Sequence, residues 1–282
     1  MHNDNKFDIS GQVIAVTGAG GVLFGAVSKA LAVRGAKVAL LDLLGDKVEK
    51  LAAEINAEGG QAIGIGCSVL DMSQTSQALR TIIDKFGQCD ALINGAGGNR
   101  TGACVSPDGR FTDLDLNELD KVFELNYKGT FLPTQVFCKY FAEQGHGNVI
   151  NTSSMSALAP LTNVPGYSNA KAAVTNFTQW LAVQVKVDFP GTDIRVNEIA
   201  PGFLDTTQNH SLLFESDNRT LTKRGESILA HTPMGRFGNP DELVGPLIML
   251  LSKAGSFMHG TTICIDGGFN AYSGVGPLNE KT

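Results

Sequence analysis

A tyrosine and a lysine that could carry out proton transfer stand four residues apart in this chain. They are Tyr167 and Lys171, near the start of a helix predicted over residues 166–187. Side chains at this spacing lie on the same face of a helix. An ammonium group beside a phenol lowers the phenol pKa, so that the hydroxyl can exchange a proton with a substrate oxygen near neutral pH. The spacing alone also fits an exposed tyrosine above a solvated lysine.

Further polar residues follow predicted strands. Ser154 comes after the fifth predicted strand, 13 residues before Tyr167, where its hydroxyl could polarise a substrate carbonyl. Residues 94–97 (NGAG) follow the fourth predicted strand, and their small side chains would let a cofactor lie along the backbone. Asn126 stands inside a predicted helix despite its low helix propensity, which fits either a solvated face or a partly buried polar position.

A glycine-rich turn joins the first predicted strand to the following helix. Its sequence is TGAGGVLFG, residues 17–25. Missing Cβ atoms let the backbone approach a pyrophosphate, and the helix N-terminus supplies N–H groups. Asp42 ends the second predicted strand, where a carboxylate can accept the ribose hydroxyls of NAD and repel the 2′-phosphate of NADP. No Arg stands in the turn or directly after Asp42, so we expect NAD(H) in preference to NADP(H). Asp42 could instead cap a helix, and a methyltransferase could share these two features.

Seven short apolar runs alternate with longer segments of helical periodicity. Strands are predicted over residues 12–17, 37–41, 62–67, 91–94, 148–152, 194–199 and 261–265. Helices are predicted over residues 23–34, 46–58, 73–86, 116–141, 166–187 and 241–251, with a kink at Pro133. This alternation predicts an α/β fold, with a parallel sheet covered by helices on both faces. We expect one doubly wound domain over residues 1–282, in which an irregular segment at 203–239 forms a loop over the substrate.

The composition is that of a mildly acidic globular chain. It has 282 residues, 43% of them hydrophobic and 18% charged, and a net charge of −6. This charge argues against nucleic acid or an anionic membrane as a partner, because both attract clustered Lys and Arg. The five cysteines are widely spaced without a CxxC motif, which argues against a disulfide framework or metal site and fits the cytoplasm. The uncharged stretch 9–28 contains five glycines, so we expect a buried strand and turn there, and neither a membrane span nor a leader segment.

Together these residues resemble the short-chain dehydrogenase/reductase (SDR) family along nearly the whole chain. The matching pieces are the glycine turn, Asp42, residues 94–97, Asn126, Ser154, Tyr167, Lys171, 195–197 (RVN), 201–202 (PG) and 266–268 (DGG). The resemblance implies an extended Rossmann fold and an NAD-dependent oxidoreductase that acts on CH–OH groups. It also implies a catalytic tetrad of Asn126, Ser154, Tyr167 and Lys171. Tyr167 would be the general acid and base, and Lys171 would lower its pKa and hold the nicotinamide ribose. Ser154 would position the substrate oxygen, and Asn126 would hold a water molecule in a proton relay.

The same resemblance implies a set of cofactor-binding residues. They are Gly18, Gly20, Gly21, Val22, Leu23, Asp42, Ser68, Val69, Asn94, Ala96, Gly97, Tyr167, Lys171, Pro201, Gly202 and Thr206. The chain departs from the family pattern at Val22 and Phe24, where the family's TGxxxGxG turn has glycine, and at Ser68, where it has Asp near the adenine. The Phe24 ring must fit where the helix start approaches the cofactor, so altered turn geometry and cofactor affinity are expected there.

Several segments resemble a narrower SDR subgroup, the D-mannonate oxidoreductases (fructuronate reductases). They are residues 17–23, 95–99 (GAGGN), 201–203 (PGF), 212–214 (LLF), 231–238 (HTPMGRFG) and 266–275 (DGGFNAYSGV). This resemblance implies D-mannonate and D-fructuronate as the substrate pair. A dehydrogenase for another polyol or keto acid, such as gluconate and 5-ketogluconate, is one alternative, and a non-catalytic nucleotide-binding homologue is another.

Polar residues suited to the hydroxyls and carboxylate of a sugar acid occur near the expected site. The candidates are Asn99, Arg100, Ser154, Gln208, Asn209 and His210, for which a solvated lid is the alternative. The family resemblance also implies a homodimer or homotetramer, formed through the helices that carry Asn126 and Tyr167 and through the last strand. The apolar series at 170, 174, 177 and 181 fits either that interface or the core. No metal site is expected.

Overall fold

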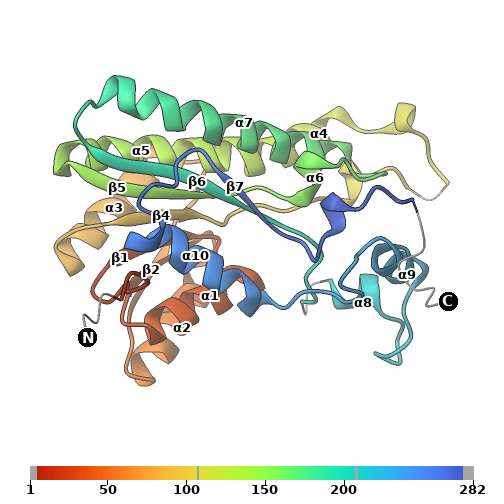
Figure 1. Ribbon diagram of the computed structural model, residues 1–282, viewed down its shortest axis with the longest axis horizontal. Coiled ribbons are helices and arrows are strands. Elements are labelled where there is room, and N and C mark those ends of the chain that lie inside the picture. The colour runs from red at the N-terminus through yellow and green to blue at the C-terminus, as the bar shows by residue number, and fades with distance from the viewer. Residues whose placement is uncertain (1–4, 107, 207–208, 276–282) are drawn as a thin grey trace.

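Seven parallel strands form one sheet in the computed structural model, which describes residues 5–106, 108–206 and 209–275 (Figure 1). The strands are β1 (Val13–Thr17), β2 (Lys37–Asp42), β3 (Gln61–Gly66), β4 (Ala91–Asn94), β5 (His146–Thr152), β6 (Asp193–Pro201) and β7 (Thr262–Ile265). Their order is β3-β2-β1-β4-β5-β6-β7. The order reverses between β1 and β4, which is the point at which doubly wound sheets bind ligands. The predicted α/β fold class is confirmed.

Helices cover both faces of this sheet (Figure 1). One face packs against α1 (Val22–Val33), α2 (Gly45–Ala57) and α10 (Val244–Leu251), and the other against α3 (Met72–Phe86), α5 (Gly129–Gln144) and α7 (Pro165–Asp188). Successive residues of a strand point to opposite faces. Ile14 and Val16 of β1 therefore join the first hydrophobic cluster, whereas Val13 and Ala15 join the second. Burial on both faces explains why the strands are continuous apolar runs.

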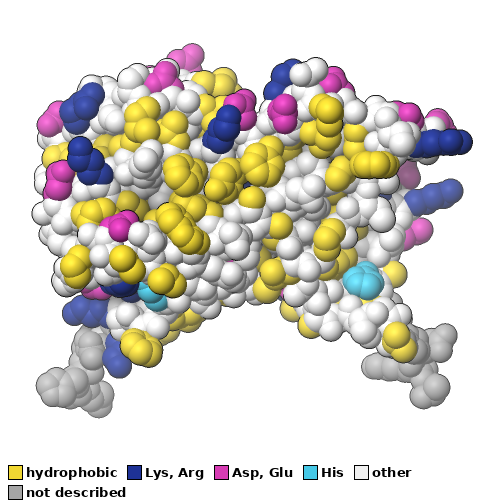
Figure 2. All heavy atoms as spheres, turned by 90° about the horizontal axis from the view of Figure 1, so that it is seen from above, with side chains coloured by type: hydrophobic (Ala, Val, Ile, Leu, Met, Phe, Trp, Pro, Cys, Tyr) yellow, Lys and Arg dark blue, Asp and Glu magenta, His cyan; other side chains and the backbone are white. Residues whose placement is uncertain are grey.

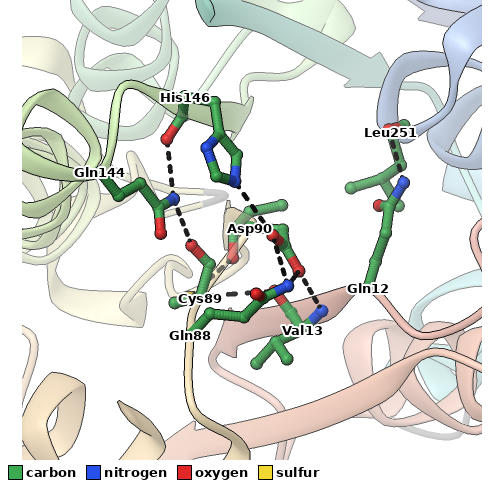
Figure 3. A network of polar contacts seen from close by, with 9 residues as sticks. Gln12, Val13, Gln88, Cys89, Asp90, Gln144, His146 and Leu251 are labelled. Carbon is green, nitrogen blue, oxygen red and sulfur yellow. Dashed lines mark hydrogen bonds and ion pairs between the residues drawn. The ribbon is translucent and has the colours of Figure 1, made fainter.

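A polar network joins three strands at their amino-terminal ends (Figure 3). The Asp90 carboxylate accepts a hydrogen bond from the Val13 N–H at 2.7 Å and lies 3.3 Å from the His146 ring. The Gln144 side chain donates to the carbonyls of Cys89 and His146. These contacts align β1, β4 and β5 at the end opposite the predicted site, so their carboxyl ends reach a common level.

A row of polar side chains crosses five strands of the sheet. Thr17, Asn94, Asn151, Glu198 and Thr262 are register partners on β1, β4, β5, β6 and β7. The first four are buried, and the amide of Asn94 donates to Asn151 at 2.8 Å. The buried side chains of this row are therefore joined by hydrogen bonds, whereas much of the rest of the sheet packs through apolar side chains.

The helix predicted over residues 116–141 is divided by a π-helical turn. It consists of α4 (Leu116–Phe123), the π turn Glu124–Lys128, and α5. The N–H of Gly129 donates to the carbonyl of Glu124, five residues earlier. An irregularity that was not predicted therefore surrounds Asn126. Turns of this type are frequent at functional sites. Pro133 lies inside α5, as predicted, and the kink there stays a prediction.

The segment at 203–239 is more regular than predicted. It contains α8 (His210–Leu213) and α9 (Lys223–Ala230), and a short α6 (Met155–Leu158) was also missed. Helices of four to eight residues are too short to give a clear periodicity. Side chains from these helices and from the loop before the C-terminal end form a third cluster of Met155, Leu213, Ile228, Phe237 and Phe269. Because Met155 follows Ser154, this cluster fixes the segment beside the predicted site (Figure 1).

Candidate active site

A cleft of about 440 Å³ opens at the carboxyl ends of β1, β2 and β4. Most of the predicted cofactor residues line it, namely Gly18, Gly21, Val22, Leu23, Asp42, Ser68, Val69, Ala96, Gly97, Tyr167 and Lys171. The glycine turn and the tyrosine–lysine pair lie more than 100 residues apart in sequence, yet they share these walls. The structure thus brings the two strongest sequence motifs into one site.

Two glycines of the turn are required by close approaches. Gly18 has a φ of +67°, and a Cβ atom there would lie 2.7 Å from the Ala96 Cα atom. A Cβ atom at Gly20 would lie 3.0 Å from the Asp42 carboxyl group. Gly20 itself does not line the cleft, so its role is to let β2 and the turn meet. Gly21 precedes α1, whose first turn has no side-chain cap, which leaves its N–H groups available to an anion.

Asp42 is held at the end of β2 by two backbone donors. One carboxylate oxygen accepts from the Gly20 N–H at 3.0 Å, and the other accepts from the Leu44 N–H at 3.0 Å. The residue that precedes α2 as its cap is Leu44, so the alternative reading of Asp42 as that helix's cap is wrong. Each carboxylate oxygen keeps further lone pairs for donors in the cleft.

The unusual Phe24 is accommodated below the turn. Its side chain is buried, with 4% exposure, and belongs to the same hydrophobic cluster as Val16. A Cβ atom at Gly95 would lie 2.4 Å from the Phe24 ring, so the glycine makes room for the ring. The helix α1 is continuous from Val22, and Phe24 also lines the cleft, so the expected effect on cofactor affinity stays a prediction. Phe24 and Gly95 form a complementary pair.

Tyr167, Lys171 and Ser154 meet where the cleft passes the ends of β4 and β5. Tyr167 lies in the first turn of α7, and the Lys171 Nζ atom is 5.6 Å from the centre of its ring. Nζ also donates to the Thr152 carbonyl at 2.8 Å. Ser154 precedes α6 and forms a hydrogen bond with Tyr167.

The pKa values of this pair differ from the sequence-based expectation. Burial raises the pKa of the Tyr167 phenol, and the hydrogen bond with Ser154 opposes that rise. Burial also lowers the pKa of Lys171 to about 8, against the opposing charge of Glu198. The net shift of the phenol pKa is therefore upward, opposite to the sequence-based expectation, because burial dominates and the Lys171 ammonium donates to the Thr152 carbonyl.

Asn126 ties the π turn to the loop after β4. Its amide nitrogen donates to the Gly98 carbonyl at 2.7 Å and to the Val122 carbonyl at 2.8 Å, and its amide oxygen accepts from the Gly98 N–H at 3.1 Å. A Cβ atom at Gly97 would lie 2.7 Å from the Asn126 amide oxygen and 3.1 Å from Lys171 Nζ. Of the two readings of Asn126, a buried polar position is confirmed, because the side chain has no exposed surface.

Asn94, predicted to bind the cofactor, is not among the residues that line the cleft. Its side chain is 1% exposed and donates to Thr134 and Asn151, each at 2.8 Å. The loop at 95–96 is held separately, by two N–H groups that donate to the Thr17 hydroxyl. Asn94 points into the sheet because it is still part of β4, and its role in this structure is to support the loop.

Three other predicted cofactor residues also lie outside the cleft walls, namely Pro201, Gly202 and Thr206. Pro201 ends β6, and Gly202 lies so close to Asp266 that a Cβ atom would be 2.6 Å from its Cα atom. The Thr206 hydroxyl bonds to the Asn209 side chain at 2.9 Å. These residues shape the turn at the end of β6.

Most of the candidate substrate residues form hydrogen bonds or ion pairs with other residues of the protein. Arg100 forms an ion pair with Glu118 at 2.7 Å, and Asn99 accepts from the Arg100 N–H. Asn209 donates to the Leu204 carbonyl. His210 lies 2.9 Å from Asp205. Gln208 lies outside the described residues. Of the predicted substrate residues, only Ser154 is placed beside Tyr167 by a contact in the described part of the chain.

Other residues of the cleft were not predicted. Leu43 and Leu70 follow Asp42 and Val69 and form exposed apolar walls. Thr152 also lines the cleft, and its buried hydroxyl has no partner among the described residues. The sequence could have indicated these residues only by their position, since each stands at or just beyond the end of a predicted strand.

The described residues contain neither a His, Cys, Asp and Glu cluster that could hold a metal ion nor a helix long and apolar enough to cross a bilayer.

Comparisons with known proteins agree with this geometry. The family model of the short chain dehydrogenases matches residues 12–216. A Haemophilus influenzae protein, described as an uncharacterized oxidoreductase, is 47% identical over 281 residues, which cover 95% of this chain and 96% of that protein.

Two solved structures are also similar. One, provisionally described as a D-mannonate oxidoreductase from Haemophilus influenzae with bound NAD, is 45% identical with a TM-score of 0.87, covering 95% of this chain and 98% of that one. The other is a gluconate 5-dehydrogenase from Burkholderia cenocepacia in complex with NADP and tartrate. It is 26% identical with a TM-score of 0.83, covering 94% and 98% of the two chains. The chain belongs to the short-chain dehydrogenase/reductase family and is an oxidoreductase.

Proposed function

We propose that the protein is an NAD(H)-dependent dehydrogenase that interconverts a secondary alcohol and a ketone on a sugar acid. The observation that carries the cofactor choice is Asp42, whose carboxylate stands at the end of β2 against Gly20. A 2′-phosphate would meet this negative charge, whereas ribose hydroxyls could donate to its free lone pairs. The bound NAD of the Haemophilus influenzae structure supports the same choice, although the NADP of the gluconate 5-dehydrogenase indicates that the fold alone does not decide it.

The residues of the cleft fit a dinucleotide. The uncapped N-terminus of α1 would hold the pyrophosphate. Leu43 and Leu70 offer apolar walls beside Ser68 and Val69 for an adenine ring. The Thr152 hydroxyl and Lys171 lie at the other end, where a nicotinamide ribose would bind. When bound, NAD(H) would supply or accept the hydride.

Tyr167 would transfer the proton. A phenol is ordinarily protonated at neutral pH, and burial raises the Tyr167 pKa further. The protonated phenol is the form that donates to a ketone oxygen during reduction. Ser154 already bonds to Tyr167, so its hydroxyl would bind the same substrate oxygen. Lys171 would bind the ribose and stabilise the phenolate, and Asn126 would hold the relay water, as the family resemblance implies.

For the substrate we propose D-mannonate and D-fructuronate. The support is the 45% identity to the structure provisionally described as a D-mannonate oxidoreductase. Gluconate and 5-ketogluconate are the second candidate, supported by the gluconate 5-dehydrogenase with its bound tartrate. The segment 203–239 would cover the substrate, because its hydrophobic cluster contains Met155, the neighbour of Ser154. The five free cysteines fit the cytoplasmic location that we propose.

We also propose that the protein is a homo-oligomer. Hydrophobic side chains are spread over the face formed by α5 and α7 (Figure 2). Trp180, Val183 and Val187 are exposed there, beside a groove of about 600 Å³. Of the two readings left open for the apolar series at 170, 174, 177 and 181, burial favours the core for the first three residues. Trp180→Glu should reduce the molar mass in light scattering, whereas Val33→Glu on α1 should not.

The substrate proposal is tested by the rate of NADH oxidation with D-fructuronate, tagaturonate and 5-ketogluconate in parallel. We expect the highest kcat/KM for D-fructuronate. A higher value for 5-ketogluconate would favour the second candidate. Binding of NADH without turnover of any of the three ketones would contradict the sugar-acid proposal.

A further inference from the structure

A buried carboxyl group lies below the tyrosine–lysine pair. Glu198 is in the middle of β6 and has no exposed surface. Its register partners are Asn151 on β5 and Thr262 on β7. An acidic side chain is rarely found fully buried unless other groups compensate its charge. Neither the sequence motifs nor the proposed mechanism gives Glu198 a role.

Three hydroxyl groups surround this carboxyl group. The Thr262 hydroxyl donates to one oxygen at 2.7 Å, and the Thr178 hydroxyl lies 3.2 Å from the other. Thr175 forms a third hydrogen bond. The donors come from β7 and from α7, so they reach the group from two sides. Such an environment accepts a carboxylate without water.

Two hydrogen-bonded chains connect Glu198 with the site. Thr175 lies 2.7 Å from the Ser153 hydroxyl, which donates to the Lys171 carbonyl at 3.2 Å. Ser153 stands between Ser154 and Thr152, whose carbonyl accepts the Lys171 Nζ hydrogen bond. On the other side, Thr178 accepts from Asn151 at 2.8 Å. Glu198 therefore lies in the hydrogen-bond network that fixes the helix turn bearing Lys171.

The cation that interacts with the Glu198 carboxyl group is Lys171. The titratable groups whose charges interact with Glu198 are Lys171 on α7 and Cys264 on β7. Burial raises the pKa of Glu198, and the Lys171 charge lowers it. The Glu198 charge in turn raises the pKa of Lys171. No direct ion pair joins them in the described part of the chain. Lys171, Thr175 and Thr178 share one face of α7, and Thr178 bonds to Glu198, so Lys171 lies on the helix face that meets this carboxyl group.

We propose that Glu198 is a positioning residue that serves as the buried counter-charge of Lys171 and keeps this lysine in its ammonium form at neutral pH. Within the proposed function, the ammonium is the form that stabilises the Tyr167 phenolate and donates to a ribose. Glu198 touches neither substrate nor cofactor, and it acts through Lys171 alone.

The direct test is the titration of Lys171 in the intact protein. Carbon-13 labelled lysine Cε signals are followed against pH by NMR, and Lys171→Arg identifies the signal. Glu198→Gln keeps the size and polarity of the side chain but removes its charge, whereas Glu198→Asp keeps the charge. We expect the Lys171 midpoint to move to lower pH in Glu198→Gln and to stay near the wild-type value in Glu198→Asp. Equal midpoints in the wild type and Glu198→Gln overturn the proposal.

A second measurement works if Glu198→Gln does not fold. Lys171→Met removes the cation, and carbon-13 labelled glutamate then reports the Glu198 carboxyl group. By linkage, its midpoint must rise when Lys171 is absent. An unchanged Glu198 midpoint in Lys171→Met overturns the proposal by an independent route.

The pH dependence of kcat/KM is a separate test, and this test rests on the proposed function. In Glu198→Gln, kcat/KM for ketone reduction should fall several-fold more at pH 8 than at pH 6, with restoration in Glu198→Asp. A structural role would lower the rate equally at both pH values and would contradict the proposal. If the wild type turns over no ketone while the NMR midpoints move as expected, the proposed function fails and the counter-charge assignment stands.

Discussion

The side-chain amide of Asn126 and the peptide groups on either side of the Gly98 Cα atom exchange two hydrogen bonds, of 2.7 and 3.1 Å. This exchange joins the π turn to the loop after β4, at the level of the tyrosine–lysine pair. The π turn thus lies at the residue whose amide reaches this loop, 28 residues away in sequence.

Asn126→Ala should therefore destabilise the protein and displace the loop. The Gly98 N–H and carbonyl would lose their partner, which costs roughly 1–3 kcal/mol for a buried polar group. Urea unfolding measures the free energy of unfolding, and the exposed Asn117→Ala on α4 is the matched control. A loss no larger than that of the control would show that the exchange contributes nothing to stability.

Asp42→Ala should weaken NADH binding and relax the choice of cofactor. Two ribose hydroxyls would lose a charged acceptor, so we expect roughly tenfold or greater weakening of the NADH Kd. The NADPH Kd should improve, because the repulsion of the 2′-phosphate is removed. Fluorescence titration measures both constants. Asp46→Asn, an exposed change on α2, is the control. An unchanged NADH Kd in Asp42→Ala would contradict the ribose assignment.

Phe24→Ala should destabilise the fold without improving the site. Truncation of a buried phenylalanine costs about 3–5 kcal/mol, because it removes apolar burial and leaves a cavity beside Gly95. Phe111→Ala, at an exposed aromatic residue, should change stability by less than about 0.5 kcal/mol. Tighter NADH binding in Phe24→Ala would mean that the ring obstructs the cofactor after all.

Because the pKa of Lys171 is lowered on folding, the free energy of unfolding should depend on pH. Its pKa is lowered from 10.5 to about 8 in the folded protein. Between these values the unfolded chain holds a proton that the folded chain has lost, so the free energy of unfolding rises with pH. Relative to Lys171→Met, the wild type should gain about 3 kcal/mol as pH rises from 8 through 10.5. Parallel stability curves for the two proteins would contradict a buried, perturbed lysine.

The sheet and the main motifs were predictable from local sequence. Strands buried on both faces are continuous apolar runs, so all seven were found within a few residues of their observed ends. The spacing of Tyr167 and Lys171 gives a common helix face whatever surrounds it. Gly18 and Asp42 were found because a tight turn and a strand end restrict residue type strongly.

The remaining features depend on partners that are distant in sequence. Phe24 looked disruptive because its complement is Gly95, on another strand's loop. Arg100 looked available to a carboxylate, although Glu118 pairs with it. Lys171 was expected to lower the phenol pKa, but its ammonium donates to the Thr152 carbonyl and the desolvation of Tyr167 raises that pKa.

The central claim is that Tyr167 transfers the proton in an NAD(H)-dependent reduction of a ketone. The most direct measurement is single-turnover oxidation of bound NADH by D-fructuronate, in wild type and in Tyr167→Phe, with the NADH Kd of both measured beforehand. We predict an equal Kd and a loss of at least about a hundredfold in the rate for Tyr167→Phe. A variant that binds NADH equally well and reduces the ketone at the wild-type rate would contradict the account.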